Sequence, residues 1–185
     1  TITTEPLSLT SKVSGDLINE AKELMKSKVN TEMALSKLNK VLDRGPPTNA
    51  IDAGSRLIDY KLSGLKRVKF PKQIKELEKL AAQVVDIAQS FAKEDLLKAL
   101  SKKLNVEVAL DQVGKLSDTA GKILRIEPFN LEAKTTMTIA DSKLNKISTK
   151  EALTTIKKIE EIAKLQDKET SIELKLFKVN ELVKT

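Results

Sequence analysis

The stretch ILRIEPFNLEA, residues 123–133, joins two predicted helices with almost no loop between them. Pro128 disfavours helical geometry at the residue before it, which ends the first helix. Asn130 belongs to the residue types that commonly cap a helix N-terminus, so it begins the second helix. Ala133 is small enough for two helices to approach closely. We therefore interpret this stretch as a junction between helices that pack directly against each other.

Apolar residues recur at helical spacing along most of the chain, and no segment alternates with the period of a strand. Turn signals such as Gly45-Pro46-Pro47 separate the helical segments. The pattern predicts an all-α fold of about nine helices with short connections. The helix that begins at Pro71 can extend as far as Leu104, where Asn105 interrupts it. The expected helical segments cover residues 13–27, 31–44, 50–65, 71–91, the continuation from there to 104, 109–127, 131–147, 149–163 and 172–183.

The composition is that of a folded, helix-rich chain. Hydrophobic residues make up 40% and charged residues 32%, with 6 Gly and 5 Pro, which is unlike a disordered chain. Because the aromatic residues are 4 Phe and 1 Tyr, we expect a core of Leu, Ile, Val and Ala. A chain of 185 residues is long enough for one domain with a buried core. We predict a flexible or extended lead at residues 1–10 and a single helical-repeat domain at residues 11–185.

The chain contains no cysteine and no histidine. Without cysteine there can be no disulfide, thiolate metal site or cysteine nucleophile. Without histidine the chain lacks the commonest general base and the commonest zinc ligand. We therefore predict that the protein is not an enzyme, and we expect no catalytic residue, no cofactor and no metal.

The sequence does not identify the cellular compartment of the protein. No apolar run approaches the roughly 20 residues that span a bilayer, so we expect a soluble chain. The N-terminal stretch TITTEPLSLTSK lacks the basic and apolar regions of a secretory signal. Because the chain begins at Thr1, we consider both a cytoplasmic protein and one exported after loss of a targeting segment.

Three places in the chain share one apolar spacing. From Ala34, Ala109 and Ala152, apolar side chains follow one, four and seven residues later. Stacked helical hairpins leave such internal repeats. Any amphipathic helix rich in Ala, Leu and Lys would match this spacing about as well, so both interpretations stay open.

The stretch from Leu116 to Ala133 resembles the end of one tetratricopeptide repeat and the start of the next. A small residue, Ala120, an apolar pair, Ile123-Leu124, and a turn proline, Pro128, stand at offsets that recur in that family. The resemblance covers about half the chain. Residues 41–46 look like a weaker copy of this stretch, and residues 151–159 resemble the second helix of a further repeat. It departs from the family where an aromatic, a glycine and a tyrosine are replaced by Lys134, Thr138 and Asp141.

The resemblance implies antiparallel helical hairpins in a tetratricopeptide-like solenoid, with a compact helical bundle as the alternative. It also implies a non-catalytic scaffold that binds another protein in a largely apolar, Lys/Glu-lined groove. One subset of the family grips a C-terminal carboxylate through Lys, Asn and Arg. Where that subset has its Lys and Asn, this chain has Glu132, Thr135 and Ile139, so we do not predict that activity.

The densest basic segment runs from residue 61 to residue 75 and contains no acid before Glu76, in a chain of net charge +7. Lysine and arginine at this density can neutralise phosphates. Binding of a polyanion, nucleic acid or another acidic partner is therefore the first alternative function, although a solvated helix junction is the commoner reason for such a segment. The candidate residues are Lys61, Lys66, Arg67, Lys69, Lys72 and Lys75.

The stretch GKLSDTAGK, residues 114–122, has the outline of a phosphate-binding loop. Its first glycine stands two positions too far from Gly121-Lys122, and Ile123 occupies the place of the Ser or Thr that binds magnesium. We therefore expect a helix there.

An exported surface or envelope interaction protein is the second alternative function. The sequence identifies neither the partner nor the oligomeric state.

Overall fold

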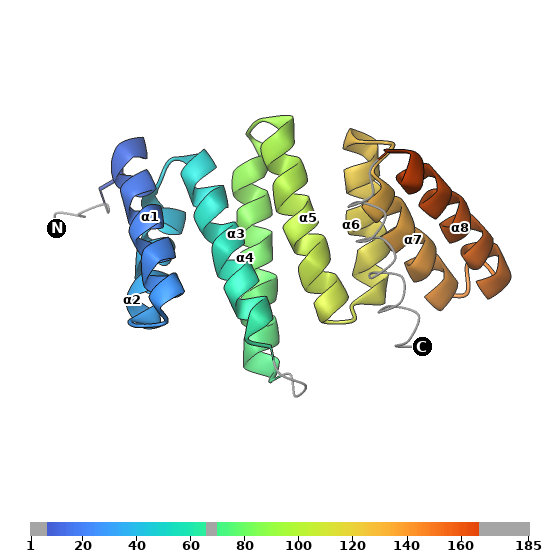
Figure 1. Cartoon of the computed structure of the whole chain (residues 1–185), viewed down its shortest axis with the longest axis horizontal. Coiled ribbons are helices and arrows are strands. Elements are labelled where there is room, and N and C mark those ends of the chain that lie inside the picture. The colour runs from blue at the N-terminus through green and yellow to red at the C-terminus, as the bar shows by residue number, and fades with distance from the viewer. Residues whose placement is uncertain (1–6, 66–69, 167–185) are drawn as a thin grey trace, which may run out of the picture. The chain divides into compact units, whose positions relative to one another are not determined.

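The computed structural model describes residues 7–65 and 70–166, and these form α-helices joined by short turns (Figure 1). The prediction of an all-α fold of packed helices is confirmed for this part of the chain, and eight helices are close to the nine expected. The predicted helix at 172–183 lies outside the described residues. The helices are α1 (Ser11–Ser27), α2 (Thr31–Arg44), α3 (Pro47–Ser63), α4 (Pro71–Gln89), α5 (Lys93–Ala109), α6 (Val113–Ile126), α7 (Leu131–Lys143) and α8 (Thr149–Gln166).

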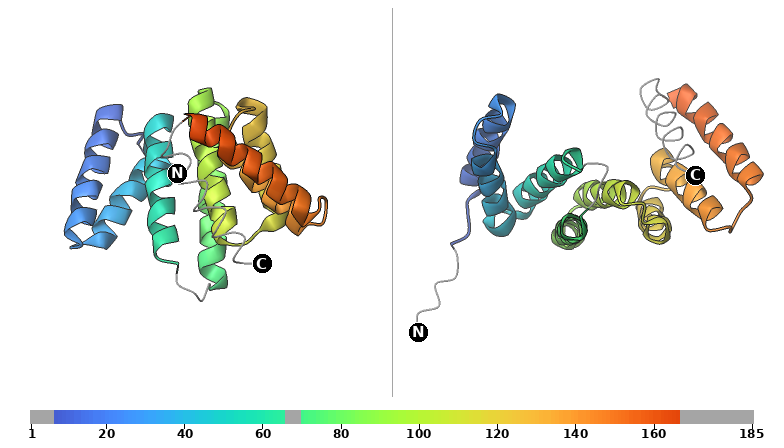
Figure 2. Two further views of the ribbon diagram at one scale, coloured as in Figure 1. Left: turned by 45° about the vertical axis from the view of Figure 1, so that its right-hand side comes forward. Right: turned by 90° about the horizontal axis from the view of Figure 1, so that it is seen from below.

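The chain forms two compact units, Thr1–Val106 and Glu107–Thr185. In the first unit α1 packs on α2, α2 on α3 and α3 on α4; in the second α6 packs on α7 and α7 on α8. Neighbouring helices within a unit run antiparallel, as Figure 2 shows for α1 with α2 and for α7 with α8. A single domain over residues 11–185 stays a prediction.

The junction at residues 123–133 has the predicted geometry. The chain leaves α6 at Glu127, whose backbone N–H still donates to the Ile123 carbonyl at 2.8 Å. The Asn130 side chain then accepts a hydrogen bond from the Ala133 N–H at 2.9 Å and caps α7. Its amide also donates to the Glu127 carboxylate at 2.7 Å, which braces the turn. Ala133 is fully buried.

The boundaries predicted between the end of α4 and the end of α5 are wrong. The helix that begins at Pro71 does not extend to Leu104, because it ends at Gln89 and α5 starts at Lys93. Asn105 does not interrupt α5, which continues to Ala109. Leu104 and Val106 on either side of this asparagine are each 1% exposed, so their burial outweighs its weak helix propensity.

The repeated apolar spacing is confirmed at two of its three places. The side chains of α2 at Ala34, Leu38 and Val41 are buried, and so are those of α8 at Ala152, Ile156 and Ile159. The prediction that a helix with this spacing begins at Ala109 is wrong. Ala109 ends α5, and the turn at residues 110–112 follows. In α6 the buried set with the same spacing is Leu116, Ala120 and Ile123.

Among the described residues, no helix is both long enough and apolar enough to cross a membrane.

Candidate functional site

A hollow of about 430 Å³ opens in the second unit between the turn before α6, the end of α7 and the start of α8. We call it the apolar hollow. Its floor is built from Ile139, Ala152 and Ile156, each less than 5% exposed, while Leu153 is 43% exposed at its mouth. Its volume lies in the range of about 300–1,000 Å³ that is typical of binding sites. The lining residues are Asp111, Val113, Ile139, Ser142, Lys143, Asn145, Thr149, Ala152, Leu153 and Ile156.

Local backbone geometry positions the rim of the apolar hollow. Asp111 and Asn145 both adopt left-handed backbone conformations, with φ of 56° and 57°. Aspartate and asparagine tolerate this region better than most residues, so each can end a helix in a tight turn. The Ser148 hydroxyl oxygen accepts from the Glu151 N–H at 3.2 Å and starts α8. These turns bring three helix ends to one place.

The charged groups of the rim differ in exposure. The ammonium of Lys143 lies 3.7 Å from the Asp111 carboxylate. The Lys143 side chain is 15% exposed, whereas that of Asp111 is 62% exposed. A partner that reaches this rim therefore meets a carboxylate more readily than an ammonium.

The first unit carries a charged surface on α3 and α5. On α3, Asp52, Arg56 and Asp59 are four and three residues apart, on the side of the helix away from its buried residues. The Lys102 ammonium of α5 contacts both oxygens of the Asp59 carboxylate, at 2.7 and 2.9 Å. The Arg56 guanidinium lies 3.2 Å from Asp52, and Lys98 of α5 lies 3.9 Å from the same carboxylate. The pairs of Lys98 and Lys102 join α5 to α3, whereas the Arg56–Asp52 pair lies within α3.

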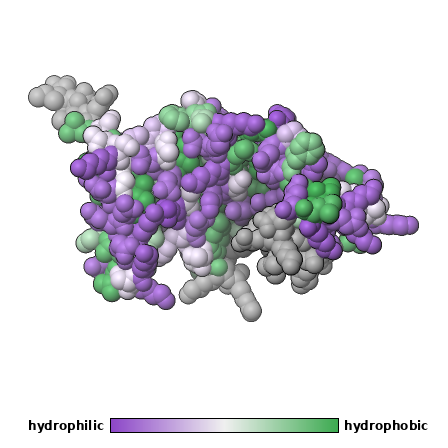
Figure 3. Space-filling model, turned by 45° about the horizontal axis from the view of Figure 1, so that its top comes forward, coloured by the Kyte–Doolittle hydropathy of each residue, from purple (hydrophilic) through white to green (hydrophobic). Residues whose placement is uncertain are grey.

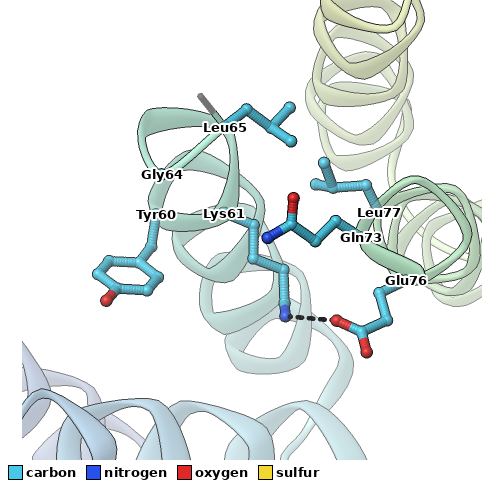
Figure 4. A pocket seen from close by; sticks show the side chains of 7 residues that line it. All are labelled: Tyr60, Lys61, Gly64, Leu65, Gln73, Glu76 and Leu77. Carbon is cyan, nitrogen blue, oxygen red and sulfur yellow. Dashed lines mark ion pairs between the residues drawn. The ribbon is translucent and has the colours of Figure 1, made fainter. Parts of the chain in front are cut away.

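The six predicted polyanion-binding residues do not form one described cluster. Lys66, Arg67 and Lys69 lie outside the described residues. Lys61 points from α3 across to α4, where its ammonium is 3.6 Å from the Glu76 carboxylate (Figure 4). The two side chains line a hollow of about 180 Å³ with Tyr60, Gly64, Leu65, Gln73 and Leu77.

Lys72 and Lys75 lie at a different place, on the solvent-exposed face of α4. They line a shallow hollow of about 420 Å³ together with Pro71, Glu76 and Lys79. Lys79 was not among the predicted residues, although its position four residues after Lys75 is a sequence signal for the same helix face. Lys61 thus lines the first hollow, Lys72 and Lys75 line the second, and Glu76 lines both.

Sequence reasoning missed the residues of the apolar hollow and of the charged surface on α3 and α5. The charged surface had a signal, because polar residues at helical spacing alternate with the apolar ones of α3. The apolar hollow had no sequence signal, since its lining comes from three separate segments. Figure 3 shows one face of the molecule, on which polar side chains prevail and apolar ones appear in small patches.

The described residues contain no group of three or more acidic, histidine or cysteine side chains that could hold a metal ion. The stretch at 114–122 lies within α6, as predicted, so it is a helix and does not form a phosphate loop. Of the positions that correspond to the carboxylate-gripping subset, Thr135 and Ile139 are 1% and 4% exposed. The Thr135 hydroxyl donates to the Leu131 carbonyl at 2.8 Å.

No protein-family model matches the sequence. No curated protein matches it either. Among solved structures, the chain is similar to the first TPR of Spaghetti (RPAP3), which was solved bound to the HSP90 peptide SRMEEVD. That match has a TM-score of 0.49 and 20% sequence identity, and it covers 74% of this chain and 99% of that chain.

Proposed function

We propose that this chain is a non-catalytic protein-binding module, and that the apolar hollow binds an apolar side chain from a segment of its partner. The observation that carries the proposal is the open apolar floor of Ile139, Ala152 and Ile156 beneath the half-exposed Leu153. A partner side chain inserted there would remove its own apolar surface and the exposed part of Leu153 from water, which favours association by about 25 cal/mol per Å² of apolar area. Buried anchors of this kind dominate many protein interfaces.

The rim indicates the chemistry beside the anchor. The Asp111 side chain is 62% exposed, whereas that of Lys143 is 15% exposed. We expect the partner segment to carry a lysine or arginine next to its apolar anchor, because opposite charges at an interface rim favour the correct register. The predicted Lys/Glu-lined groove is thus replaced in this proposal by a groove with an exposed aspartate.

Selection from a displayed library of random peptides tests the proposal with no partner chosen in advance. The wild-type chain should enrich peptides with a large aliphatic or aromatic residue beside a basic one. Leu153→Lys should abolish their binding, since it places a charge at the mouth of the apolar hollow. The matched control is Leu165→Lys, on the same helix but 89% exposed and outside the lining, and it should bind like the wild type.

Asp111→Asn provides a second, finer control. Asparagine tolerates the left-handed backbone at this position, so the turn should persist. The selected peptides should keep their apolar residue and lose the preference for a basic neighbour. Equal loss of binding in the Leu153 and Leu165 variants, or enrichment of peptides without an apolar residue, would contradict the proposal.

A further inference from the structure

Three lysines form a straight row on α4. Lys72, Lys75 and Lys79 are three and four residues apart and all are exposed. We call this row the α4 lysine row. The opposite face of the helix is buried, with its apolar side chains in the core of the first unit. Those buried residues are Leu77, Leu80, Ala81, Val84, Val85 and Ala88.

The charge of the α4 lysine row is not neutralised by the described part of the chain. None of its three ammonium groups lies within 4.0 Å of a carboxylate of a described residue. The acid that lines the same hollow is Glu76, and its carboxylate is directed to Lys61 of α3. The hollow of about 420 Å³ is therefore bordered by three lysines and by one acid that already has a cationic partner.

The spacing of the row suits a chain of phosphates. At 1.5 Å of rise per residue, the three lysines extend over about 10 Å of the helix axis. Each ammonium stands on a flexible four-carbon stem, so it can adjust to its phosphate. Phosphates of one DNA strand follow each other at about 3.4 Å along the duplex axis, so the row can contact two or three of them.

We propose that the α4 lysine row binds the phosphodiester backbone of nucleic acid without reading its sequence. Lysine acts as a point charge on phosphates, whereas specific base contacts mostly require bidentate side chains such as arginine, asparagine or glutamine. An anionic membrane is the less suitable ligand, because a helix that binds a membrane inserts its apolar face. The apolar face of α4 is already buried in the protein core.

The test is fluorescence anisotropy of a short labelled duplex DNA, titrated with the full chain at several salt concentrations. The triple variant Lys72→Glu, Lys75→Glu, Lys79→Glu should bind at least about tenfold more weakly at about 50 mM salt. The slope of log affinity against log salt should decrease in magnitude by about 2–3, since each lost phosphate contact contributes about 0.9.

A charge-matched control distinguishes binding by the α4 lysine row from attraction by the overall positive charge. The variant Lys12→Glu, Lys40→Glu, Lys93→Glu has the same net charge as the α4 variant, and all three of its positions are exposed in the same unit. It should keep nearly the wild-type salt slope. Lys61→Gln should also leave binding unchanged, because that lysine already faces Glu76.

The α4 variant must keep the wild-type circular dichroism spectrum and melting temperature. If it does not, the neutral variant Lys72→Gln, Lys75→Gln, Lys79→Gln replaces it, with the same expected direction. Undetectable DNA binding by the wild-type chain would overturn the proposal, and so would an equal loss in both charge-reversal variants. Binding to phosphatidylcholine–phosphatidylserine vesicles in the absence of any binding to DNA would overturn it as well.

Discussion

Thr119 of α6 donates its hydroxyl hydrogen bond to the Glu107 carboxylate near the end of α5, with an oxygen–oxygen distance of 2.8 Å. Both residues are nearly inaccessible, at 1% and 2% exposure. A carboxylate that leaves water at such a site needs hydrogen-bond donors to offset its lost hydration. The threonine therefore stabilises the region where α5 ends and the turn to α6 begins.

Thr119→Val should lower the free energy of unfolding by about 1–3 kcal/mol, because it keeps the shape of the side chain but removes a donor from a buried acceptor. Thr119→Ser keeps the hydroxyl and should lose less. Urea denaturation followed by circular dichroism measures both variants. If the valine variant were as stable as the wild type, the hydrogen bond would have no net effect on folding.

Gly54 of α3 lies directly against Val84 of α4. A Cβ at this glycine would overlap the Val84 side chain and would lie 3.1 Å from Leu42 Cδ1. Gly54→Ala should therefore destabilise the protein by about 1–3 kcal/mol, because the α3–α4 packing would have to move apart. The matched control is Gly15→Ala in α1, where a Cβ meets no atom within 4 Å. It should raise stability by up to about 1 kcal/mol through helix propensity. Thermal unfolding of the two variants should shift in opposite directions.

Asn130 caps α7 through the hydrogen bond from the Ala133 N–H. Asn130→Ala removes that acceptor and should cost about 0.5–2 kcal/mol of stability. Asn130→Ser keeps an N-cap acceptor and should recover most of the loss. Chemical denaturation of the wild type and both variants provides the comparison. Equal stability of the alanine and serine variants would show that the cap contributes nothing.

The ion pair between Lys102 and Asp59 links α5 to α3 with short contacts to both carboxylate oxygens. The lysine and aspartate side chains are nevertheless 23% and 55% exposed, so solvent screens the pair. A double-mutant cycle with Lys102→Met and Asp59→Asn should give a coupling energy of about 0.2–1 kcal/mol. The coupling should decrease when salt is added. A coupling that is insensitive to salt would indicate a desolvated pair instead.

Sequence signals that act within one helical turn were sufficient to predict the local structure. Pro128 and Asn130 determine the α6–α7 junction through their own backbone and side-chain chemistry, so the sequence predicts it correctly. Asn105 shows the opposite case, since its weak helix propensity is outweighed by the burial of Leu104 and Val106 on either side. That burial is a property of the folded chain, and the propensity of Asn105 alone does not report it.

The composition of the candidate sites likewise depends on tertiary packing. Lys61, Lys72 and Lys75 belong to one basic segment in the sequence, but the packing of α3 on α4 places Glu76 opposite Lys61 and leaves Lys72 and Lys75 exposed. The apolar hollow combines residues 111–113, 139–145 and 149–156, which only the packed helices bring together.

The sequence by itself thus determined the all-α class, the helical hairpins and the tight junction at residues 123–133, because helix periodicity and capping act over a few residues. The tertiary structure alone decided which lysines stay unneutralised and where an apolar surface remains open. Those properties depend on how side chains from separate helices cover one another.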